Sequence, residues 1–384
     1  MYDEKPWVKS YDSGIPESLA PYPDVSVFDL LEQAAEKYPT RDSSVMSASL
    51  PVVGRVSQAV TYRELNNLVD RLTAALQDRG VKKGDRVGIV LANSTQFVIS
   101  FYAILKAGAT VVALNPTFPP KKWAGQLNDA DIRVAIVMSS FYEGINSVRA
   151  ETPIEHIIVT NIKEFLPPLA RLLFTLAREK KDGHYVESLK DGDAWLPDIL
   201  KTYTAKQRKP VEIKPKEDSA IFQYTGGTTG LPKAARGPHS ALVANTVQMR
   251  AWLASQGAET DSFLAAVPLF HVYGMVAVLN FAVSIGAPMY MVPNPRDIPD
   301  VLDVITTFKP TIFMGVPALY NAINNRDDLD KYDLSSIRGC ISGSAPLAPE
   351  TKRKFEQLTG GRLMEGFGMS EAPTATHCNP FQGE

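Results

Sequence analysis

Apolar, β-branched runs alternate with helical patterns over most of the chain. From Tyr62 to Arg79, apolar residues recur every three or four positions behind Thr61, which predicts an amphipathic helix with Thr61 as its N-cap. The same spacing predicts helices over Thr95–Lys106 and Lys121–Asp129. Four runs are typical of buried strands: Arg86–Leu91, Thr110–Leu114, Val134–Met138 and Ile157–Thr160. Such repeated strand–helix units predict a doubly wound, mostly parallel sheet with flanking helices on both faces.

A second series of the same kind begins at Ser219. Its expected strands are Ser219–Tyr224, Phe263–Val267, Met289–Val292, Thr311–Met314, Gly339–Ser342 and Arg362–Glu365. We therefore expect an α/β protein with two doubly wound subdomains, residues 1–215 and residues 217–384. The first would contain an insert over about residues 161–200, followed by a linker rich in Lys and Pro over residues 201–216, whose charges we expect to be solvated.

The insert contains a basic amphipathic segment, residues 167–181 (PPLARLLFTLAREKK). Its apolar face is formed by four leucines, and its charge by four cations: Leu169, Leu172, Leu173 and Leu176; Arg171, Arg178, Lys180 and Lys181. Basic amphipathic helices can lie on anionic membranes. A surface helix packed on its own domain is the simpler interpretation, and peripheral contact with the inner face of a membrane stays open beside it.

Composition and charge exclude several classes of protein. The chain has 384 residues, 45% of them hydrophobic, and its 40 basic and 42 acidic residues leave a net charge of −2. This balance argues against a nucleic-acid binder held by a broad basic field. Two cysteines, Cys340 and Cys378, form neither a disulfide framework nor a zinc motif, and we expect both to be inert. The polar N-terminus lacks a secretory pattern, so we expect a cytoplasmic protein.

One uncharged stretch, Ser262–Pro295, could imitate a membrane span. Pro268 and Pro288 interrupt it, and a spanning helix needs about 20 continuous apolar residues. We therefore expect buried strands and a helix here, and no membrane span.

The segment with the strongest chemical signal is Tyr224–Lys233 (YTGGTTGLPK), directly after an expected strand. Its glycines allow tight turns and close approach to a ligand, its threonines add hydroxyl donors, and Lys233 adds a positive charge. This combination suits phosphate oxygens. The loop is not a Walker A motif, because Leu231 and Pro232 precede the lysine and Ala234 follows it.

This loop resembles the phosphate-binding signature of the adenylate-forming superfamily, which includes acyl-CoA synthetases, luciferases and peptide-synthetase adenylation domains. Three further segments resemble its motifs in the expected order: Pro268–Gly274 (PLFHVYG), Gly343–Leu347 (GSAPL) and Glu365–Glu371 (EGFGMSE). The resemblance runs from about Val25 to the last residue. Within the superfamily the chain looks most like the large N-terminal domain of bacterial long-chain fatty-acid–CoA ligases, because of YTGGTTG, Asn294–Pro299 and the amphipathic insert.

The resemblance implies a role for each motif residue. ATP would be bound by Tyr224, Thr225, Gly226, Gly227, Thr228, Thr229, Gly230, Lys233, Gly343, Ser344, Ala345, Glu365, Gly366, Phe367, Gly368 and Ser370. The acyl group would contact His271, Tyr273, Gly274 and Gly315. Mg²⁺ would be held by Thr225 and Glu371, and the catalytic set would be Thr229, Lys233, His271 and Glu371.

Several positions depart from the family pattern or allow a simpler interpretation. Phe367 replaces the usual Tyr, which keeps a flat face for adenine but loses a phenolic hydrogen bond. Ser370 replaces Thr, Ala234-Ala235-Arg236 replaces Gly-Val, and His239 stands in an altered context. His271 could be a satisfied core histidine. His156, His184 and His377 lack partners at useful spacing and receive no role.

The implied activity is ATP-dependent activation of a fatty acid to acyl-AMP and then, with CoA, to acyl-CoA. A fatty-acyl-AMP ligase that loads a carrier protein, a binding module without catalysis, and a membrane-tethering protein are the alternatives; a homodimer also stays open. The family's Thr-Gly-Asp motif and the C-terminal domain with its lysine do not occur before Glu384. We therefore hypothesise that the C-terminal domain is absent and that this chain alone binds weakly and turns over poorly; robust acyl-CoA formation would contradict this.

Overall fold

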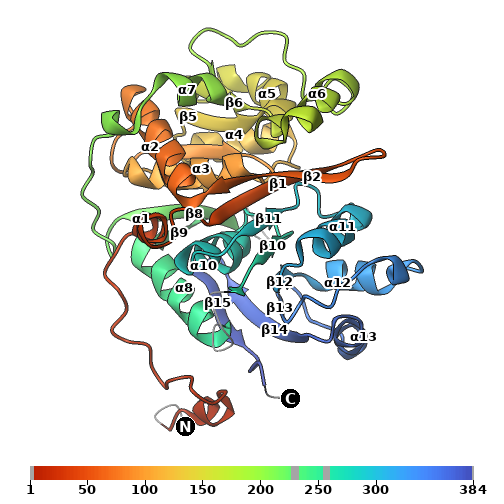
Figure 1. Cartoon of the computed structure of the whole chain (residues 1–384). Helices are drawn as coiled ribbons and strands as arrows, with labels where there is room; N and C mark the ends of the chain where they lie inside the picture. Colours follow the sequence, from red (N-terminus) through yellow and green to blue (C-terminus); the bar gives the residue numbers. More distant parts are fainter. Residues whose placement is uncertain (1–3, 226–232, 254–259, 383–384) are drawn as a thin grey trace.

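The computed structural model describes residues 4–225, 233–253 and 260–382, and contains two mostly parallel sheets (Figure 1). The seven-stranded sheet has the order β7 (Ala194–Trp195), β6 (His156–Thr160), β5 (Val134–Met138), β3 (Arg86–Val90), β4 (Thr110–Ala113), β8 (Ser219–Thr225) and β9 (Lys233–Pro238). Its neighbouring strands are parallel except for the β8–β9 hairpin.

The eight-stranded sheet forms the other half of the molecule (Figure 1). Its order is β15 (Ala372–Cys378), β14 (Arg362–Met369), β13 (Gly339–Ser342), β12 (Ile312–Gly315), β10 (Phe263–Ala265), β11 (Met289–Met291), β1 (Asp42–Leu50) and β2 (Gly54–Thr61). Antiparallel pairing is confined to its two ends, β14–β15 and β1–β2. The predicted α/β class with two mostly parallel sheets is confirmed.

Helices cover both faces of the seven-stranded sheet. Because side chains alternate along a strand, Ile136 joins the core with α2 (Tyr62–Asp78) and α3 (Thr95–Lys106), whereas Val137 joins the core with α4 (Pro120–Asp129) and α5 (Ser139–Asn146). The sheet is therefore buried on both sides, which explains why its strands are continuous apolar runs.

The eight-stranded sheet is covered in the same way. One face packs on α11 (Ile298–Phe308), α12 (Pro317–Asn324) and α13 (Pro349–Thr359). The other shares a central core with α1 (Val27–Lys37), α8 (His239–Leu253), α10 (Phe281–Ser284) and the helices of the first sheet. Hydrogen bonds cross this core, from the Tyr102 hydroxyl to Asn280 Oδ1 at 3.0 Å and from the Tyr62 hydroxyl to the Ala287 carbonyl at 2.7 Å. The two sheets are thus parts of one five-layered body.

The predicted division at residues 215 and 217 does not match the sheets. Strand β8 lies in the first sheet, where Val111 pairs with Ile221, and β1 lies in the second sheet, where Ser44 pairs with Met289. Strand β1 escaped prediction because it is rich in serine. Its buried Ser43 and Ser44 are satisfied by the Val60 carbonyl and by the Thr95 hydroxyl.

Most predicted elements are confirmed within one or two residues. Helix α3 has the predicted limits, and Thr61 caps α2, since its hydroxyl accepts from the Glu64 amide. Strand β14 is longer than expected and continues from Arg362 to Met369. The uncharged stretch contains a π-helical segment, η7 (Met275–Asn280), between α9 (Val272–Gly274) and α10.

The expected linker 201–216 is packed against the body, and its charged side chains are exposed as expected, with the exception of Arg208. After α7 (Leu196–Thr202) and η4 (Ala205–Gln207), Arg208 joins a cluster of charges on the helices of the first half. Lys106, whose side chain is fully buried, lies 2.8 Å from Glu32 and 2.9 Å from Asp70, and Arg208 approaches the same two carboxylates. Because two cations and two anions pair with one another in this cluster, the charge of Lys106 can be buried.

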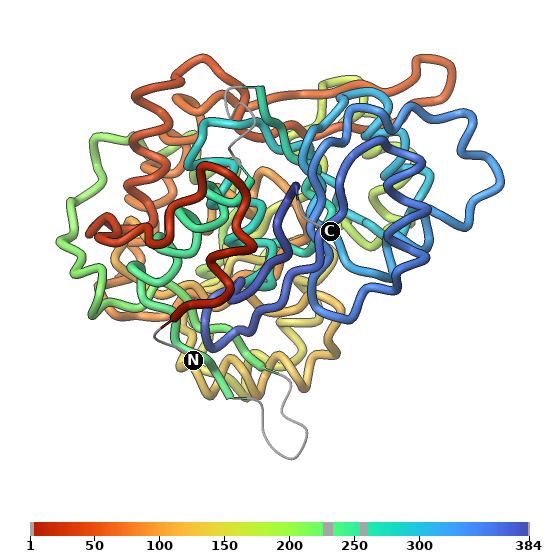
Figure 2. The backbone as a smooth tube through the Cα atoms, turned by 90° about the horizontal axis from the view of Figure 1, so that it is seen from below, coloured from red at the N-terminus to blue at the C-terminus, as the bar shows by residue number. Residues whose placement is uncertain are grey.

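Both ends of the described chain lie near the eight-stranded sheet. Figure 2 shows the N-terminal segment, which includes η1 (Pro6–Ser10), passing close to β15. The Asp12 carboxylate accepts from the amides of Phe381 and Gln382 at 2.6 and 3.0 Å. Within the part of the chain that the structure describes, no helix is both long and apolar enough to cross a membrane.

Candidate functional site

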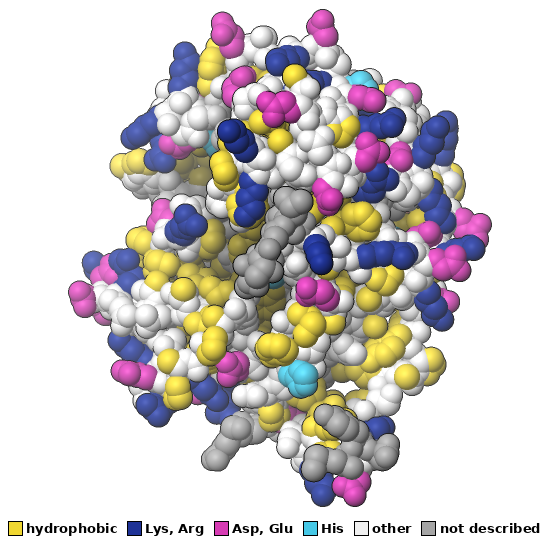
Figure 3. Space-filling view, turned by 180° about the vertical axis from the view of Figure 1, so that it is seen from behind, with side chains coloured by type: hydrophobic (Ala, Val, Ile, Leu, Met, Phe, Trp, Pro, Cys, Tyr) yellow, Lys and Arg dark blue, Asp and Glu magenta, His cyan; other side chains and the backbone are white. Residues whose placement is uncertain are grey.

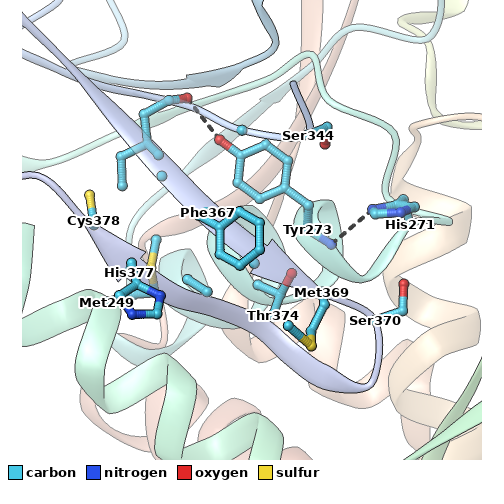
Figure 4. A pocket seen from close by; sticks show the side chains of 15 residues that line it. Met249, His271, Tyr273, Ser344, Phe367, Met369, Ser370, Thr374, His377 and Cys378 are labelled. Carbon is cyan, nitrogen blue, oxygen red and sulfur yellow. Dashed lines mark hydrogen bonds between the residues drawn. The ribbon is translucent and has the colours of Figure 1, made fainter. Parts of the chain in front are cut away.

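A pocket of about 240 Å³ opens beside the edge of the eight-stranded sheet, at the end that carries β15 (Figure 4). Its wall is formed by Met249, His271, Tyr273, Ile341, Gly343, Ser344, Gly366, Phe367, Gly368, Met369, Ser370, Thr374, Ala375, His377 and Cys378. Three predicted motifs that are far apart in the sequence therefore meet in one place. Figure 3 shows hydrophobic side chains gathered along the hollow between the two halves of the molecule.

One wall is the β14–β15 hairpin, in which β14 continues a buried parallel strand into an exposed antiparallel pair. The strands approach closely at Gly368, where a Cβ atom would lie 1.8 Å from the Thr374 carbonyl oxygen. The buried amide of Asn245 on α8 holds β15 in place: its oxygen accepts from Thr374 and Ala375, and its nitrogen donates to Ala375. Packing on α8 thus fixes the side chains that follow on β14.

Phe367 is the largest side chain that this hairpin exposes. It is 60% exposed, and its ring centre lies 6.0 Å from that of His377 on β15. An aromatic face left open beside a pocket can stack on a flat ligand such as a purine. His377, to which we assigned no role from the sequence, also lines the pocket.

The opposite wall begins at His271, the N-cap of α9. Its Nδ1 accepts from the Tyr273 amide at 3.2 Å, so the proton of the neutral ring is on Nε2. Burial lowers the pKa of His271, and the ring is therefore neutral near pH 7. The adjacent Tyr273 donates its hydroxyl to the Ile341 carbonyl at 2.8 Å, which fixes its ring across the pocket. His271 can therefore offer a hydrogen-bond donor without bringing a charge.

The Gly343–Leu347 loop connects β13 to this site. A Cβ atom at Gly343 would lie 3.3 Å from the Tyr273 ring, and Ser344 has a positive φ of 72°. A non-glycine residue in this conformation is uncommon and strained, and such strain is concentrated at functional sites. Glu365 on β14 accepts from the Leu347 amide at 2.9 Å, so its role in the structure is to hold this loop.

The β8–β9 hairpin supports the glycine- and threonine-rich loop. Thr225 and Lys233 pair across its last rung, and the predicted ligands Gly226, Gly227, Thr228, Thr229 and Gly230 lie outside the described residues. A Walker A loop joins a strand to a helix, whereas this loop joins two antiparallel strands. The Tyr224 hydroxyl is engaged elsewhere, since it donates to Asp129 at 2.6 Å on α4.

The two residues expected to hold Mg²⁺ are only partly committed to other contacts. Glu371 is exposed in the turn of the β14–β15 hairpin, next to Ser370 of the pocket, and its carboxylate has no hydrogen bond or ion pair to any described residue. The Thr225 hydroxyl donates to the Lys233 carbonyl at 3.4 Å. No cluster of three or more His, Cys, Asp or Glu exists in the described ranges that could hold a metal ion by itself.

Some predicted residues do not line the pocket. Gly274 is required for packing, since a Cβ atom there would lie 2.2 Å from the Pro268 carbonyl oxygen. Gly315 lies under the Tyr320 ring, and Ala345 and Glu365 lie outside the wall. His239 is a core residue: its Nδ1 accepts from the Val27 amide at 3.1 Å, and burial lowers its pKa to about 4.

The sequence alone did not indicate the contribution of α8 and β15. Met249, Thr374, Ala375, His377 and Cys378 line the pocket because α8 packs against β15. Cys378 is partly buried, and burial raises the pKa of its thiol to about 12, in agreement with its expected inertness. The segment Ala372–Cys378 (APTATHC) has no alternation of apolar and polar residues and contains a proline, so no local signal indicated β15.

Comparison with known proteins gives the same architecture. The model of the family "AMP-binding enzyme" matches residues 31–384. A long-chain-fatty-acid–CoA ligase of Bacillus subtilis is 34% identical over all of this chain, which spans 66% of that protein. A solved long-chain-fatty-acid-CoA ligase of Archaeoglobus fulgidus superposes with a TM-score of 0.78 at 24% identity, over 96% of this chain and 69% of that one. An anthranilate CoA ligase in complex with anthranoyl-AMP gives 0.79 at 25% identity, over 95% and 64%. The chain therefore belongs to the AMP-binding enzyme family and corresponds to about two thirds of the length of its relatives.

Proposed function

We propose that the protein activates a long-chain fatty acid with ATP and transfers the acyl group to CoA. The observation that carries the proposal is the convergence of His271–Tyr273, Gly343–Ser344 and the β14–β15 hairpin on one pocket. These segments resemble the acyl, adenine and metal motifs of adenylate-forming enzymes. The names of the relatives, several of which are long-chain-fatty-acid–CoA ligases, support the substrate and the acceptor.

In the first half of the reaction a carboxylate oxygen attacks the α-phosphorus of ATP, and the bond to pyrophosphate breaks. The product is acyl-AMP. In the second half the CoA thiolate attacks the acyl carbon and AMP leaves, which gives the thioester. Both halves need reactants held in line and negative charge stabilised in a site that excludes water.

The residues of this chain would supply those conditions. Phe367 offers a face for adenine, the Gly343–Ser344 backbone lies beside it, and the neutral His271 offers an Nε2–H donor to the acyl carboxylate or carbonyl. Thr225–Thr229 and Lys233 would neutralise the phosphates. The acyl group would lie beside Tyr273, which lines the pocket, and the apolar residues 274–283 behind it are buried in the core.

The donor groups fit Mg²⁺ that is held largely by the nucleotide. Glu371 offers one exposed carboxylate and Thr225 one hydroxyl, and Mg²⁺ is commonly bound by one or two side chains together with phosphate oxygens and water. When bound, the ion would supply charge neutralisation at the phosphates. The site residues of this chain would orient it and leave its remaining positions to ATP.

The substrate class is tested by binding of non-hydrolysable acyl-sulfamoyl-adenosines to the purified chain, measured by calorimetry. We expect affinity to rise as the acyl group is lengthened from acetyl to hexadecanoyl, because each buried methylene contributes about 0.8 kcal/mol. Equal affinity for all acyl lengths, or a preference for an aromatic acyl group, would contradict the fatty-acid assignment. A hydroxamate trapping assay with ATP and the same acids then tests the adenylation step itself.

A further inference from the structure

The α6 helix (Pro168–Ala177) exposes an apolar stripe to solvent. Its four leucines, Leu169, Leu172, Leu173 and Leu176, are 49%, 56%, 38% and 75% exposed. They occupy positions i, i+3, i+4 and i+7, so they form one continuous face of about 100°. The simpler expectation, a surface helix that buries its apolar face on its own domain, is therefore not met.

The helix is firmly attached by its other side. Ala170 is buried, the Phe174 ring lies 5.6 Å from that of His184, and the Arg171 guanidinium donates to the Glu164 carbonyl. At the end of the helix Glu179 accepts from Lys163 at 2.6 Å and from Asn161 at 2.8 Å. The leucines are thus held outward by buried contacts.

The charge around the stripe is mainly positive. Helix α6 contains no acidic residue, and it carries Arg171; Arg178, Lys180 and Lys181 follow it. Of the nearby acids, Asp182 pairs with Arg178 and Glu179 pairs with Lys163. Lys180 lies 4.7 Å above the ring of Tyr185, which is itself 52% exposed. An apolar stripe beside unpaired lysines and an amphipathic aromatic ring is complementary to an anionic lipid surface.

We infer that α6 docks this protein on the surface of an anionic phospholipid bilayer, with the four leucines inserted among the headgroups. Ten helical residues extend about 15 Å, half the apolar thickness of a bilayer, so the helix lies in the plane of the membrane. A second copy of the chain fits the surface less well, because a symmetric contact would bring the same cations of both copies together. Figure 1 places α6 in the half of the molecule opposite β14 and β15, so docking leaves the pocket free.

The test is cosedimentation of the protein with vesicles of phosphatidylcholine alone or mixed with phosphatidylglycerol. We expect binding to the mixed vesicles that falls with salt, and a loss of roughly tenfold or more in the double variant Leu172→Ser/Leu176→Ser. The matched control is Val52→Ser/Val53→Ser, which changes two other exposed apolar side chains, 108% and 59% exposed at the tip of β1–β2, and should leave binding unchanged.

A second readout keeps the inference falsifiable. A Leu172→Trp variant should show a blue shift of its fluorescence when mixed vesicles are added, and none with phosphatidylcholine at high salt. Wild-type protein that does not sediment with mixed vesicles, or a serine variant that binds as well as wild type, would overturn the inference. The inference would also be overturned if the serine variant changed only the oligomeric state of the protein in sedimentation. The leucine face of α6 would then be covered by a second copy of the chain.

Discussion

The β8–β9 hairpin and the β14–β15 hairpin each close one end of a mostly parallel sheet with an antiparallel pair. Around the first, strand side chains are engaged by the protein: Tyr224 bonds Asp129, and Arg236 bonds Ser219. Around the second, Phe367, Met369 and Glu371 point to the pocket or to solvent.

The difference separates two ways of building a ligand site on a strand end. In β8–β9 the strands act as a support, and the chemistry would belong to the loop between them. In β14–β15 the strands themselves would provide the ligand contacts, and the support comes from α8 through Asn245. Changes at Tyr224 should therefore affect stability alone, while changes at Phe367 should affect binding alone.

The largest effect is expected from closing the gap between β14 and β15. Gly368→Val places a side chain where even a Cβ atom would lie 1.8 Å from the Thr374 carbonyl. We expect the free energy of unfolding to fall by about 3 kcal/mol or more, together with loss of adenylate binding. Urea denaturation measures the first and calorimetry the second. Gly125→Ala on the exposed side of α4, with no atom within 4 Å of the new Cβ, is the control and should stabilise slightly.

Removal of the clamp from α8 should have the next largest effect. Asn245→Leu leaves the amides of Thr374 and Ala375 and the Ala375 carbonyl without partners, which should cost about 2 kcal/mol or more. Asn325→Ala, which removes an exposed hydrogen bond to Asn321 at the end of α12, should cost less than about 0.5 kcal/mol. Equal losses in the two variants, measured by urea denaturation, would mean that Asn245 is not the clamp.

The start of α8 should make stability depend on pH. Burial lowers the pKa of His239 to about 4 from an ordinary value of 6.5, so the unfolded chain binds more protons than the folded chain between these values. Stability is fully present above about pH 6.5 and falls as pH drops toward 4. Between pH 7.5 and pH 5 this histidine should contribute about 2 kcal/mol.

The contribution of His239 is isolated by comparison with His239→Asn. Acidic residues away from His239 titrate alike in both proteins and therefore cancel in the difference between the two pH profiles; Asp218 is the acid that interacts with this ring. The wild type should lose about 2 kcal/mol more than the variant over this range. Parallel profiles would show that the ring is not kept neutral by burial.

The smallest effect is expected at Tyr224. Tyr224→Phe removes a hydroxyl that donates to Asp129 at 2.6 Å and should cost about 1 kcal/mol of stability without altering ligand binding. Phe367→Ala at the exposed position of the other hairpin should leave the urea midpoint almost unchanged. A loss of binding in Tyr224→Phe would remove the distinction between the two hairpins.

The sequence allowed prediction of the parts of the fold whose signal is local. Strands such as Val134–Met138 are buried on both faces and therefore apolar throughout, and α2 carries its own cap. Strand β1 was not predicted because its buried serines look like exposed polar residues in the sequence. Their hydroxyl groups are buried only because they bond the Val60 carbonyl and the Thr95 hydroxyl, which lie on other elements. Strand β1 joins the second sheet by pairing with β11, and β8 joins the first sheet by pairing with β4. Each pairing connects segments far apart in the sequence, so no local pattern predicts it.

The candidate site was predictable where a motif is contiguous. His271, Gly343, Ser344 and Phe367 were expected together and line one pocket. Asn245 and His377 were not expected, because tertiary packing alone brings α8 and β15 to the motif residues. Gly274 is the opposite case, a motif residue that does not line the pocket. A glycine is needed there because the backbone passes close to the Pro268 carbonyl.

The most direct test of the account is calorimetric titration of the wild-type chain and of Phe367→Ala with hexadecanoyl-sulfamoyl-adenosine. We expect the wild type to bind this ligand more tightly than AMP. The variant should remain folded but bind the ligand about tenfold more weakly, since the stacking face is gone. Equal affinity in the two proteins, or no binding preference for the acyl-adenylate over AMP, would contradict the assignment of this pocket.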